Sequence, residues 1–583
     1  YDEKGNKTRA IENGLTTSYT YDERGNCIDI QYADGSRETF QYNARDQKTY
    51  AQDRDGVTAE WVYDSAGRCI TVRKAGVAIW EGVYDSAGQL TSSREAGLGE
   101  KRYGYDANGF VSSVSIRENG MEFTERYTND AIGRALRYED AAGQVWTYEY
   151  GAKTVTEVTP LGLKKVYWYN NRKDLIAVEE KDSERNESRL TQLNYDRRHL
   201  VKEVRDGARN VTRYEYRADG KVISEKRGAW EKRYEYDSAG RIAKIIQKKA
   251  GASEAFETSA AYSLQGADRV QVFTDGLGNK QVYRYDAWSR LTEQVNAAGE
   301  AFKRTYSAGG RALTAQGSYG GAYRYGYEAG LVTSFGKDGD SAVKRSYSPT
   351  GLLLTETDRD GKQRRYSYTE RGLLKTIGTD EGTISYTYDG AGRVIEQTAY
   401  TEANGHSYRT RYRYDGRTVT EERGAYTTTY NLDGWGNPIR KTDGEGWSER
   451  YRYDRLGRVT EVRDDIGLLA GYTYNELSLV ASERHGTEIP VVYTYNAIGL
   501  LERAERGNEI LLTRSYDKAG RLVREKKQGS PEKTYRYDAL GRLTEVRSAG
   551  AVQAQYRYGS YGKTVTYTDG AGSEYLFEKD SYG

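Results

Sequence analysis

Hydrophobic and polar side chains alternate along this chain in short runs. Tyr535 and Tyr537 are two residues apart, and Arg536 lies between them. Successive side chains of a strand point to opposite faces, so the two tyrosines share one face and the arginine takes the other. After a polar gap, Leu543–Val546 forms a second short run. The pattern predicts two short antiparallel strands joined by a turn.

The polar gap has the chemistry of a tight turn. An aspartate such as Asp538 accepts a hydrogen bond from its own backbone two residues on, which starts a turn. A glycine such as Gly541 takes positive φ without steric cost and ends the turn. We therefore expect a type I turn closed by a left-handed glycine, a common hairpin connection.

The same unit, a tyrosine followed by Asp or Asn and four residues later by Gly, returns about every 21 residues along the chain. A fixed period of this size is the signature of a repeat array. About 28 such units, each with two strands, predict about 56 strands. Representative structural anchors of the repeat are Tyr21, Asp22, Gly25, Tyr63, Asp64, Gly67, Tyr453, Asp454, Gly457, Tyr537, Asp538 and Gly541.

A sheet of this size cannot stay flat. At ~4.8 Å per strand it would be roughly 270 Å wide, and twisted open sheets rarely exceed about ten strands without curling. We therefore predict an all-β fold, a repetitive antiparallel hairpin array coiled into a hollow spiral β-shell. No linker interrupts residues 1–583, which we interpret as one array. It begins on an anchor and stops inside a turn, so we expect an excerpt truncated at both ends of a longer polypeptide.

Composition narrows the function classes. Lys and Arg number 88 against 86 Asp and Glu, so no strong field favours nucleic acid or an anionic membrane. Hydrophobic residues make up 37%, with 55 Tyr and 8 Phe, which suits a wetted wall better than a dry core. The longest apolar stretches, such as Ile466–Ala470, are far too short to span a membrane.

The repeat sequence resembles a known family. The pattern Tyr-Asp-x-x-Gly-Arg followed by Leu or Val occurs at Tyr388 to Val394, Tyr453 to Val459 and Tyr537 to Leu543. It is similar to the YD repeat, also called the rearrangement-hotspot or RHS repeat, and the resemblance covers essentially the whole chain. Members are large secreted or surface proteins: bacterial polymorphic toxins, wall-associated proteins, cocoon subunits of insecticidal toxin complexes, and teneurins.

The resemblance implies a function. Repeats of this family form a hollow β-shell, and in bacterial members the shell encloses a C-terminal toxin that a self-cleaving segment releases. We therefore expect a non-enzymatic shell that shields a C-terminal toxin or effector of the same polypeptide, secreted by a bacterium or held at its surface or cell wall. The self-cleaving segment has an Asp-Pro core motif, and none of the five prolines here follows Asp.

Three anchors depart from the standard spacing: Tyr150, Tyr414 and Tyr558. Each is followed by a segment of the type Thr-Val-Thr without the usual turn. We expect wider turns or bulges there, where the spiral changes curvature.

The cysteines suggest no special chemistry. Cys27 and Cys69 occupy the position six residues after an anchor, which elsewhere holds Leu, Val or Ile. Cysteine there is a small apolar filler. The two sulfurs should lie about 19 Å apart, four strands from each other, whereas a disulfide needs Cα atoms within about 7 Å. We expect both thiols to be free and poorly reactive.

No catalytic, cofactor or metal site is expected from the remaining residues. His199, His406 and His485 are isolated from one another and from cysteine pairs, which disfavours zinc. No nucleophile elbow has a histidine partner. The acidic turn Asp358–Gly361 has oxygens suited to Ca²⁺, although a plain aspartate-capped turn explains the same residues.

Interleaved Tyr and Arg suit two further ligands. Stacking platforms beside a basic groove bind single-stranded nucleic acid, but the balanced charge argues against it. Carbohydrate binding by exposed tyrosines stays open, and a surface adhesion module that binds carbohydrate or a partner protein is the alternative to the shell. Cross-strand aromatic ladders and Arg–Tyr stacking within the wall explain the same pattern.

Overall fold

The computed structural model describes residues 1–266, 268–317, 321–338 and 340–578. It is built from 54 β-strands and one 3₁₀ turn, η1 (Ser560–Gly562), and the described residues contain no α-helix. Every strand pairs antiparallel with the next one in the sequence, so the whole chain forms a single meandering sheet.

The strands of the first half are β1 (Arg9–Glu12), β2 (Leu15–Tyr21), β3 (Cys27–Gln31), β4 (Arg37–Tyr42), β5 (Lys48–Gln52), β6 (Thr58–Tyr63), β7 (Cys69–Lys74), β8 (Val77–Tyr84), β9 (Leu90–Glu95), β10 (Glu100–Tyr105), β11 (Val111–Glu118), β12 (Met121–Asn129), β13 (Ala135–Glu139), β14 (Val145–Tyr150), β15 (Thr154–Val158), β16 (Leu163–Tyr169), β17 (Leu175–Asp182), β18 (Glu187–Tyr195), β19 (Val201–Arg205), β20 (Val211–Tyr216), β21 (Val222–Arg227), β22 (Trp230–Tyr236), β23 (Ile242–Lys249), β24 (Ala255–Gln265), β25 (Asp268–Thr274) and β26 (Lys280–Tyr285).

Those of the second half are β27 (Leu291–Val295), β28 (Ala301–Tyr306), β29 (Ala312–Gly317), β30 (Tyr323–Glu328), β31 (Leu331–Lys337), β32 (Val343–Tyr347), β33 (Leu353–Thr357), β34 (Gln363–Tyr368), β35 (Leu374–Thr379), β36 (Gly382–Tyr388), β37 (Val394–Thr401), β38 (His406–Asp415), β39 (Thr418–Arg423), β40 (Tyr426–Leu432), β41 (Pro438–Asp443), β42 (Ser448–Tyr453), β43 (Val459–Arg463), β44 (Leu468–Tyr474), β45 (Val480–His485), β46 (Val491–Tyr495), β47 (Leu501–Arg506), β48 (Glu509–Tyr516), β49 (Leu522–Lys527), β50 (Lys533–Tyr537), β51 (Leu543–Ser548), β52 (Ala551–Tyr558), β53 (Thr564–Asp569) and β54 (Glu574–Glu578).

A regular repeat is a hairpin with a bulge at its turn. Between β50 and β51, Tyr537 pairs with Leu543, and the register shifts by one residue beside this pair. Gly541 has a φ of 78°, and its N–H donates to the carbonyl of Asp538 at 3.0 Å. The Asp538 carboxylate accepts from the N–H of Leu540, two residues on, at 2.9 Å. The turn therefore has the aspartate start and the left-handed glycine end that its sequence predicts.

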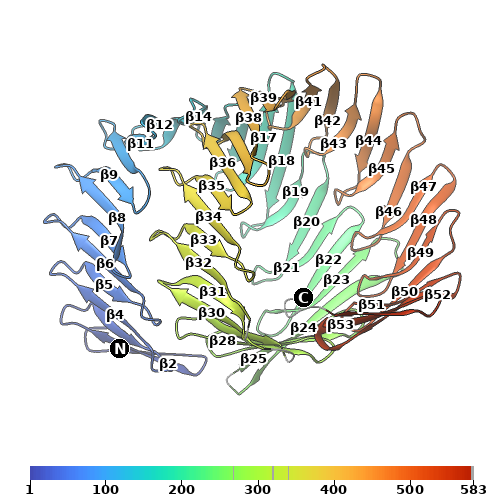
Figure 1. The fold of residues 1–583 in the computed structure, drawn as a ribbon, viewed down its shortest axis with the longest axis horizontal. Helices are drawn as coiled ribbons and strands as arrows, with labels where there is room; N and C mark the ends of the chain where they lie inside the picture. Colours follow the sequence, from blue (N-terminus) through green and yellow to red (C-terminus); the bar gives the residue numbers. More distant parts are fainter. Residues whose placement is uncertain (267, 318–320, 339, 579–583) are drawn as a thin grey trace.

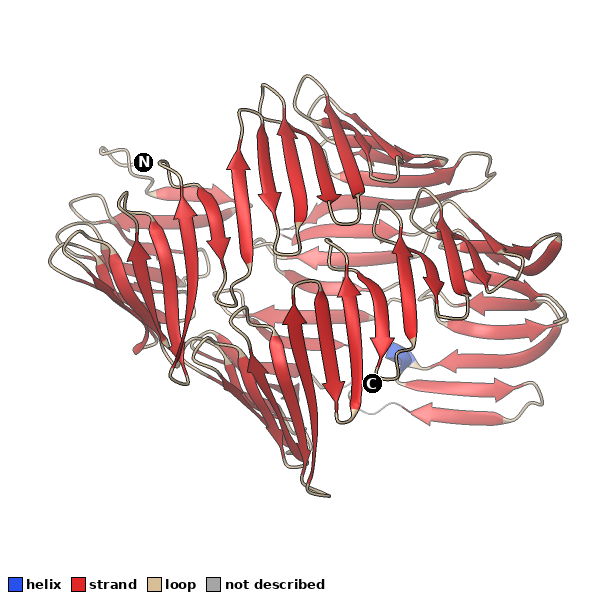
Figure 2. Ribbon diagram, turned by 90° about the horizontal axis from the view of Figure 1, so that it is seen from above, coloured by secondary structure: helices blue, strands red, loops and turns tan. Residues whose placement is uncertain are grey.

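The sheet is wound into a spiral. In Figure 1 the chain rises through β4–β9 (blue), crosses the top at β11–β18, descends through β19–β23 and returns along a second, similar path through β30–β52. The view turned by 90° shows hairpins side by side along the whole strip (Figure 2). Contacts between the two windings give the number of strands in one winding. The β5–β6 turn meets the β28–β29 turn, 23 strands later. The sheet does not close on itself.

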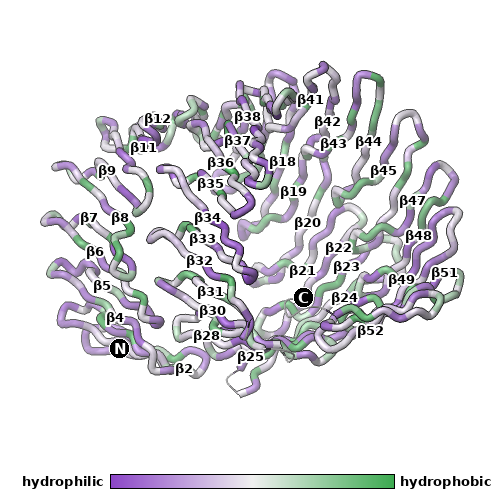
Figure 3. Tube along the Cα trace, in the orientation of Figure 1, coloured by the Kyte–Doolittle hydropathy of each residue, from purple (hydrophilic) through white to green (hydrophobic). Residues whose placement is uncertain are grey.

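The wall has almost no dry core. Its accessible surface is 33557 Å², against about 21,000 Å² for a compact monomer of this mass. Among the described residues, the largest fully buried side chains are polar: Asp182, Asp433 and Ser448. Hydrophobic stretches are short and scattered between hydrophilic ones along the strip (Figure 3). A one-layer sheet leaves most of its residues half-buried and few fully buried, which agrees with the low hydrophobic content.

The irregular anchors differ from their prediction. Tyr150 pairs with Val155 and Tyr414 with Val419 without the register shift of a regular repeat. Their hairpins are tighter than the regular ones, because these loops have no extra residue to place in a bulge. The expectation of a wider turn or bulge was wrong at both. After Tyr558 the loop does widen and contains η1.

Candidate functional site

Twenty tyrosines of the repeats bind the preceding repeat through the hydroxyl, and Tyr537 is representative. The Tyr537 O–H donates to the carbonyl oxygen of Leu522 at 2.8 Å. Leu522 is the residue that pairs with the previous anchor, Tyr516, at the bulge of the preceding hairpin. The phenol thus satisfies a carbonyl beside a bulge, where the ladder of hydrogen bonds is locally disrupted. Burial raises the pKa of Tyr537, so the hydroxyl stays protonated and remains a donor.

This bond recurs along the strip, at donor–acceptor distances of 2.6–3.0 Å and to a carbonyl 14, 15 or 20 residues earlier. The twenty tyrosines that make it are Tyr21, Tyr63, Tyr105, Tyr150, Tyr195, Tyr216, Tyr236, Tyr262, Tyr306, Tyr327, Tyr347, Tyr368, Tyr388, Tyr414, Tyr453, Tyr474, Tyr495, Tyr516, Tyr537 and Tyr558.

The arginine after the turn glycine binds in the opposite direction along the chain. Arg521 pairs with its own turn aspartate, Asp517, at 2.7 Å. Its Nη1 donates to the backbone carbonyl of Asp538 in the next repeat at 2.8 Å, and its guanidinium lies 5.2 Å from the Tyr537 ring centre. This repeat therefore contacts the next through a stacked arginine, and the next repeat contacts it in return through the Tyr537 hydroxyl.

The Tyr, Asp and Gly anchors predicted from the sequence form these turns and these contacts between repeats. Asp22, Asp64, Asp454 and Asp538 each accept hydrogen bonds from their own turn backbone. Gly25, Gly67, Gly457 and Gly541 have φ between 78° and 92°. Tyr21, Tyr63, Tyr453 and Tyr537 donate to the preceding repeat. The sequence analysis missed the role of the hydroxyl, and the signal was present in the preference for Tyr over Phe.

Besides the contacts between neighbouring repeats, other contacts join one winding to the next. We call the line of these contacts the seam. The turns that follow the anchor tyrosines in the second winding meet the opposite edge of the sheet in the first winding. Arg417, in the turn after Tyr414, forms two 2.9 Å hydrogen bonds to the carboxylate of Asp182. Its Nε donates to the carbonyl of Leu161 at 2.8 Å. The Asp182 carboxylate also accepts from the N–H of Gly434 at 2.7 Å.

Two further arginines repeat this polarity at the seam. Arg371 contacts Glu118 at 3.2 Å, and Arg311 contacts Asp53 and Asp55 at 2.8 Å and 2.5 Å. In each pair the acid belongs to the first winding and the arginine to the second.

Both Glu118 and Asp182 remain ionised at neutral pH. Burial by itself would raise the pKa of each carboxyl, but hydrogen bonds from arginine and from backbone N–H groups outweigh it. The net effect is that the pKa of each carboxyl lies below its ordinary value.

The seam arginines come from repeats that depart from the usual sequence. Ser307, four residues before Arg311, replaces the aspartate of a regular repeat, so the Arg311 guanidinium has no carboxylate in its own turn and reaches the other winding. Thr369 likewise replaces the aspartate, and Arg371 lies two residues after it, just before the turn glycine Gly372. The turn of Arg417 is shortened. Among the irregular anchors, Tyr414 and Tyr558 therefore precede seam contacts: the loop after Tyr558 places the Tyr561 N–H on the Glu300 carboxylate.

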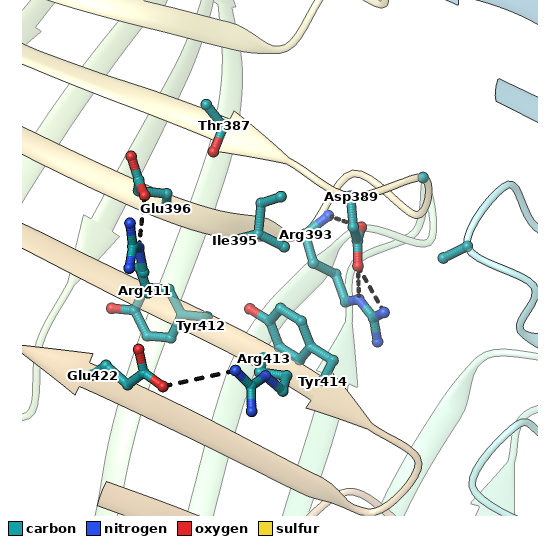
Figure 4. A pocket seen from close by; sticks show the side chains of 12 residues that line it. Thr387, Asp389, Arg393, Ile395, Glu396, Arg411, Tyr412, Arg413, Tyr414 and Glu422 are labelled. Atoms are coloured by element: carbon teal, nitrogen blue, oxygen red, sulfur yellow. Dashed lines mark hydrogen bonds and ion pairs between the residues drawn. The ribbon is translucent and has the colours of Figure 1, made fainter. Parts of the chain in front are cut away.

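The windings approach closely enough to require glycine at one of these turns. A Cβ added to Gly390 would lie 2.0 Å from the carbonyl oxygen of Ala141 in the other winding. Beside this contact is a groove of about 620 Å³, lined by β36–β39 and Ala142. Figure 4 shows that its charged side chains are paired with one another, Arg393 with Asp389 and Arg411 with Glu396. No unpaired charge in this groove marks a ligand.

The other candidate residues show ordinary environments. Cys27 and Cys69 are free, half-buried rather than buried, and burial raises the pKa of both thiols. Within the part of the chain that the structure describes, no three His, Cys, Asp or Glu residues are grouped to hold a metal ion. The Asp358 carboxylate caps its own turn through the N–H groups of Asp360 and Lys362. The described residues form no helix that is long and apolar enough to cross a membrane.

Similar solved structures are known. The crystal structure of TcdB2–TccC3 matches at 12% identity and a TM-score of 0.43, over 97% of this chain and 39% of that one. The Tc holotoxin pore of Photorhabdus luminescens matches at 12% identity and a TM-score of 0.29, over 94% of this chain and 43% of that one. The chain thus spans about two fifths of the length of these structures. No curated protein matches it.

Family models match the chain directly. The teneurin YD-shell model matches residues 4–186 and 487–583, and the RHS repeat model matches residues 347–384 and 433–465. Together these segments make up more than half of the chain, and each consists of the tyrosine hairpins described above. The chain belongs to the YD/RHS repeat family.

Proposed function

We propose that this chain is the wall of a container that encloses and shields a toxin or effector domain of the same, longer polypeptide, in a protein that a bacterium secretes or carries at its surface. The observation that supports this most directly is the winding of a one-layer sheet with 1.6 times the surface of a compact protein of this mass. The wall itself needs no catalytic group for this role.

The dimensions of the spiral suit a small cargo. A winding of about 23 strands at ~4.8 Å each has a circumference of roughly 110 Å and a radius of about 18 Å. Half the ~10 Å thickness of a packed sheet leaves an inner radius of about 12–13 Å. Two windings of ~20 Å strands then enclose on the order of 2 × 10⁴ Å³. That volume is comparable with a folded domain of about 100 residues, a common domain size.

Two measurements test the proposal. Small-angle scattering should give a radius of gyration well above the ~25 Å of a solid 583-residue globule, with the pair-distance profile of a hollow body. A reporter domain of about 100 residues, fused directly after the last repeat, should resist a protease that digests the same reporter on a 60-residue Gly/Ser linker. A compact scattering profile, or equal digestion of both reporters, would overturn the proposal.

A surface adhesin is the second candidate, because tyrosine side chains near two neighbouring hairpin tips are highly exposed. Tyr426 is 82% exposed and Tyr408 is 63% exposed, both beside hairpin tips of the second winding. Exposed tyrosines suit carbohydrate or partner-protein contacts. A glycan array with the wild-type chain and the Tyr408→Ser, Tyr426→Ser variant would separate the candidates, since glycan binding lost in the variant favours the adhesin.

A further inference from the structure

The seam includes a position at which both facing turns are short. The first winding has the two-residue turn Ala75–Gly76 there, between β7 and β8, and the second has Ala329–Gly330, between β30 and β31. These strands belong to neighbouring windings (Figure 1). The facing turns one repeat earlier, 53–57 and 307–311, are longer and form ion pairs with each other. Among the described residues, no hydrogen bond or ion pair joins the two short turns, and an opening is left between the windings.

The opening is a cleft of about 670 Å³ with mostly apolar walls. The first winding contributes Val77, Ile79 and Trp80 to these walls, and the second winding contributes Leu331 and Tyr347. Sites for small molecules have volumes of roughly 300–1,000 Å³ and are lined mainly by hydrophobic and aromatic side chains. The cleft has both properties.

Two features of the sequence shape the cleft. Ala75 and Ala329 both line it, with φ of 48° and 47°, at a turn position that Asn, Asp or Gly usually takes. Methyl groups therefore stand where polar side chains are common. Gly82 lies two residues after Trp80 on the same face of β8, and a Cβ on Gly82 would lie 2.3 Å from the indole ring. Glycine at this position therefore leaves room for the Trp80 ring beside the cleft.

The charged groups of the cleft leave one half-buried cation without a partner. Arg345 and Glu95 are neutralised by ion pairs of their own. Lys74 lines the cleft and is half-buried, and it makes no hydrogen bond or ion pair among the described residues. Glu328, at the other side of the cleft, is exposed to water. Because burial of an unpaired charge is costly, an anion that reaches the Lys74 ammonium would be stabilised there.

We propose that the cleft between Ala75 and Ala329 binds a small aromatic anion, with its rings against Trp80 and its acidic group on the Lys74 ammonium. Aromatic rings suit the walls, because aromatic pairs attract each other beyond the area that they bury. A molecule in the cleft contacts both windings, so it bridges the seam where the turns themselves do not meet. The site lies in the wall, and the proposal holds whether or not the interior carries a cargo.

The test uses two fluorescent probes that differ by one charged group. Anilinonaphthalene sulfonate is an aromatic anion, and phenylnaphthylamine has the same rings without the sulfonate. Lys74→Gln removes the ammonium, and Lys375→Gln, at an exposed lysine of β35 outside the cleft, is its matched control. Val77→Trp fills the cleft and removes no polar group. Circular dichroism and melting temperature establish that each variant is folded.

Fluorescence titration of each protein with each probe gives the result. We expect the sulfonate probe to bind wild type and Lys375→Gln equally at a saturable site, and to bind Lys74→Gln about tenfold more weakly. The neutral probe should bind Lys74→Gln as it binds wild type. Val77→Trp should weaken the binding of both probes at least about tenfold. No saturable binding to wild type, unchanged binding to Val77→Trp, or an equal effect of Lys74→Gln on both probes would overturn the proposal.

Discussion

The pair of Arg417 and Asp182 is the sharpest point at which to test the seam. The Asp182 side chain is 0% exposed and that of Arg417 is 15% exposed, and the two form a bidentate pair. Removal of one partner of a buried pair costs roughly 3–5 kcal/mol, because a buried charge is left without compensation. In Arg417→Ala the carboxylate keeps the N–H groups of Gly434 and Glu184. We therefore expect about 3 kcal/mol, the low end of that range.

The assay must report locally, since a repeat array need not unfold in one step. The N–H of Gly434 donates directly to Asp182, so its hydrogen exchange reports the opening of the seam at this point. A loss of about 3 kcal/mol corresponds to exchange that is faster by roughly two orders of magnitude. Arg413→Ala is the control: Arg413 is 77% exposed and 3.9 Å from Glu422, and it should leave this exchange unchanged.

A double-mutant cycle separates the pair from its surroundings. If Asp182→Leu with Arg417→Met is less destabilised than the sum of the single changes by about 1–2 kcal/mol, the two side chains are coupled as the structure requires. Strictly additive effects, or unchanged exchange at Gly434 in Arg417→Ala, would refute the reasoning that this ion pair holds the two windings together.

Three further perturbations test the repeat and the seam. Gly541→Val should cost about 1–3 kcal/mol of stability by thermal unfolding, because the glycine has positive φ, whereas Ala539→Val in the same turn should cost little. Tyr537→Phe should lose about 1 kcal/mol, the net value of one hydrogen bond, and Tyr535→Phe, whose hydroxyl makes no hydrogen bond among the described residues, should lose less; equal losses would contradict the hydroxyl's role. Because the pKa of Asp182 is lowered in the folded state, its contribution is fully present above the ordinary value of about 4 and is lost as pH falls through the lowered one. Melting temperature should therefore be flat from pH 8 to 5 and decline below 4, with a smaller decline in Asp182→Asn.

Most of the strip could be predicted from the sequence because the information is local. The period, the alternation of Tyr535 and Tyr537 about Arg536, and the turn from Asp538 to Gly541 involve residues that are neighbours in the chain. Local rules of strand and turn geometry then give an all-β meander, and the limit on flat sheets gives its curling. The partner of the tyrosine hydroxyl was not predicted, because the free carbonyl depends on a bulge in the neighbouring hairpin.

The seam could not be predicted because its contacts are about 250 residues apart. Nothing in the neighbourhood of Arg311 or Asp55 indicates that they meet, since that depends on the number of strands in one winding. That number follows from the small rotation between neighbouring hairpins, which accumulates over the strip. The sequence identifies the irregular anchors, and we expected them to mark changes of curvature. In the structure, two of them, Tyr414 and Tyr558, instead precede contacts between windings.

The repeats that depart from the usual sequence therefore have a structural role, which is to form contacts between windings. In a strip of identical Tyr-Asp-x-x-Gly-Arg units, every arginine would pair with its own turn aspartate and stack on the tyrosine of the next repeat, as Arg521 does. Such a strip would lack the ion pairs that Arg311 and Arg417 form with acids of the other winding. Replacement of the aspartate by Ser307 releases Arg311 from its turn, and the released guanidinium reaches an acid of the other winding. Regular repeats thus form the wall, and irregular repeats such as those of Arg311 and Arg417 add ion pairs between its windings.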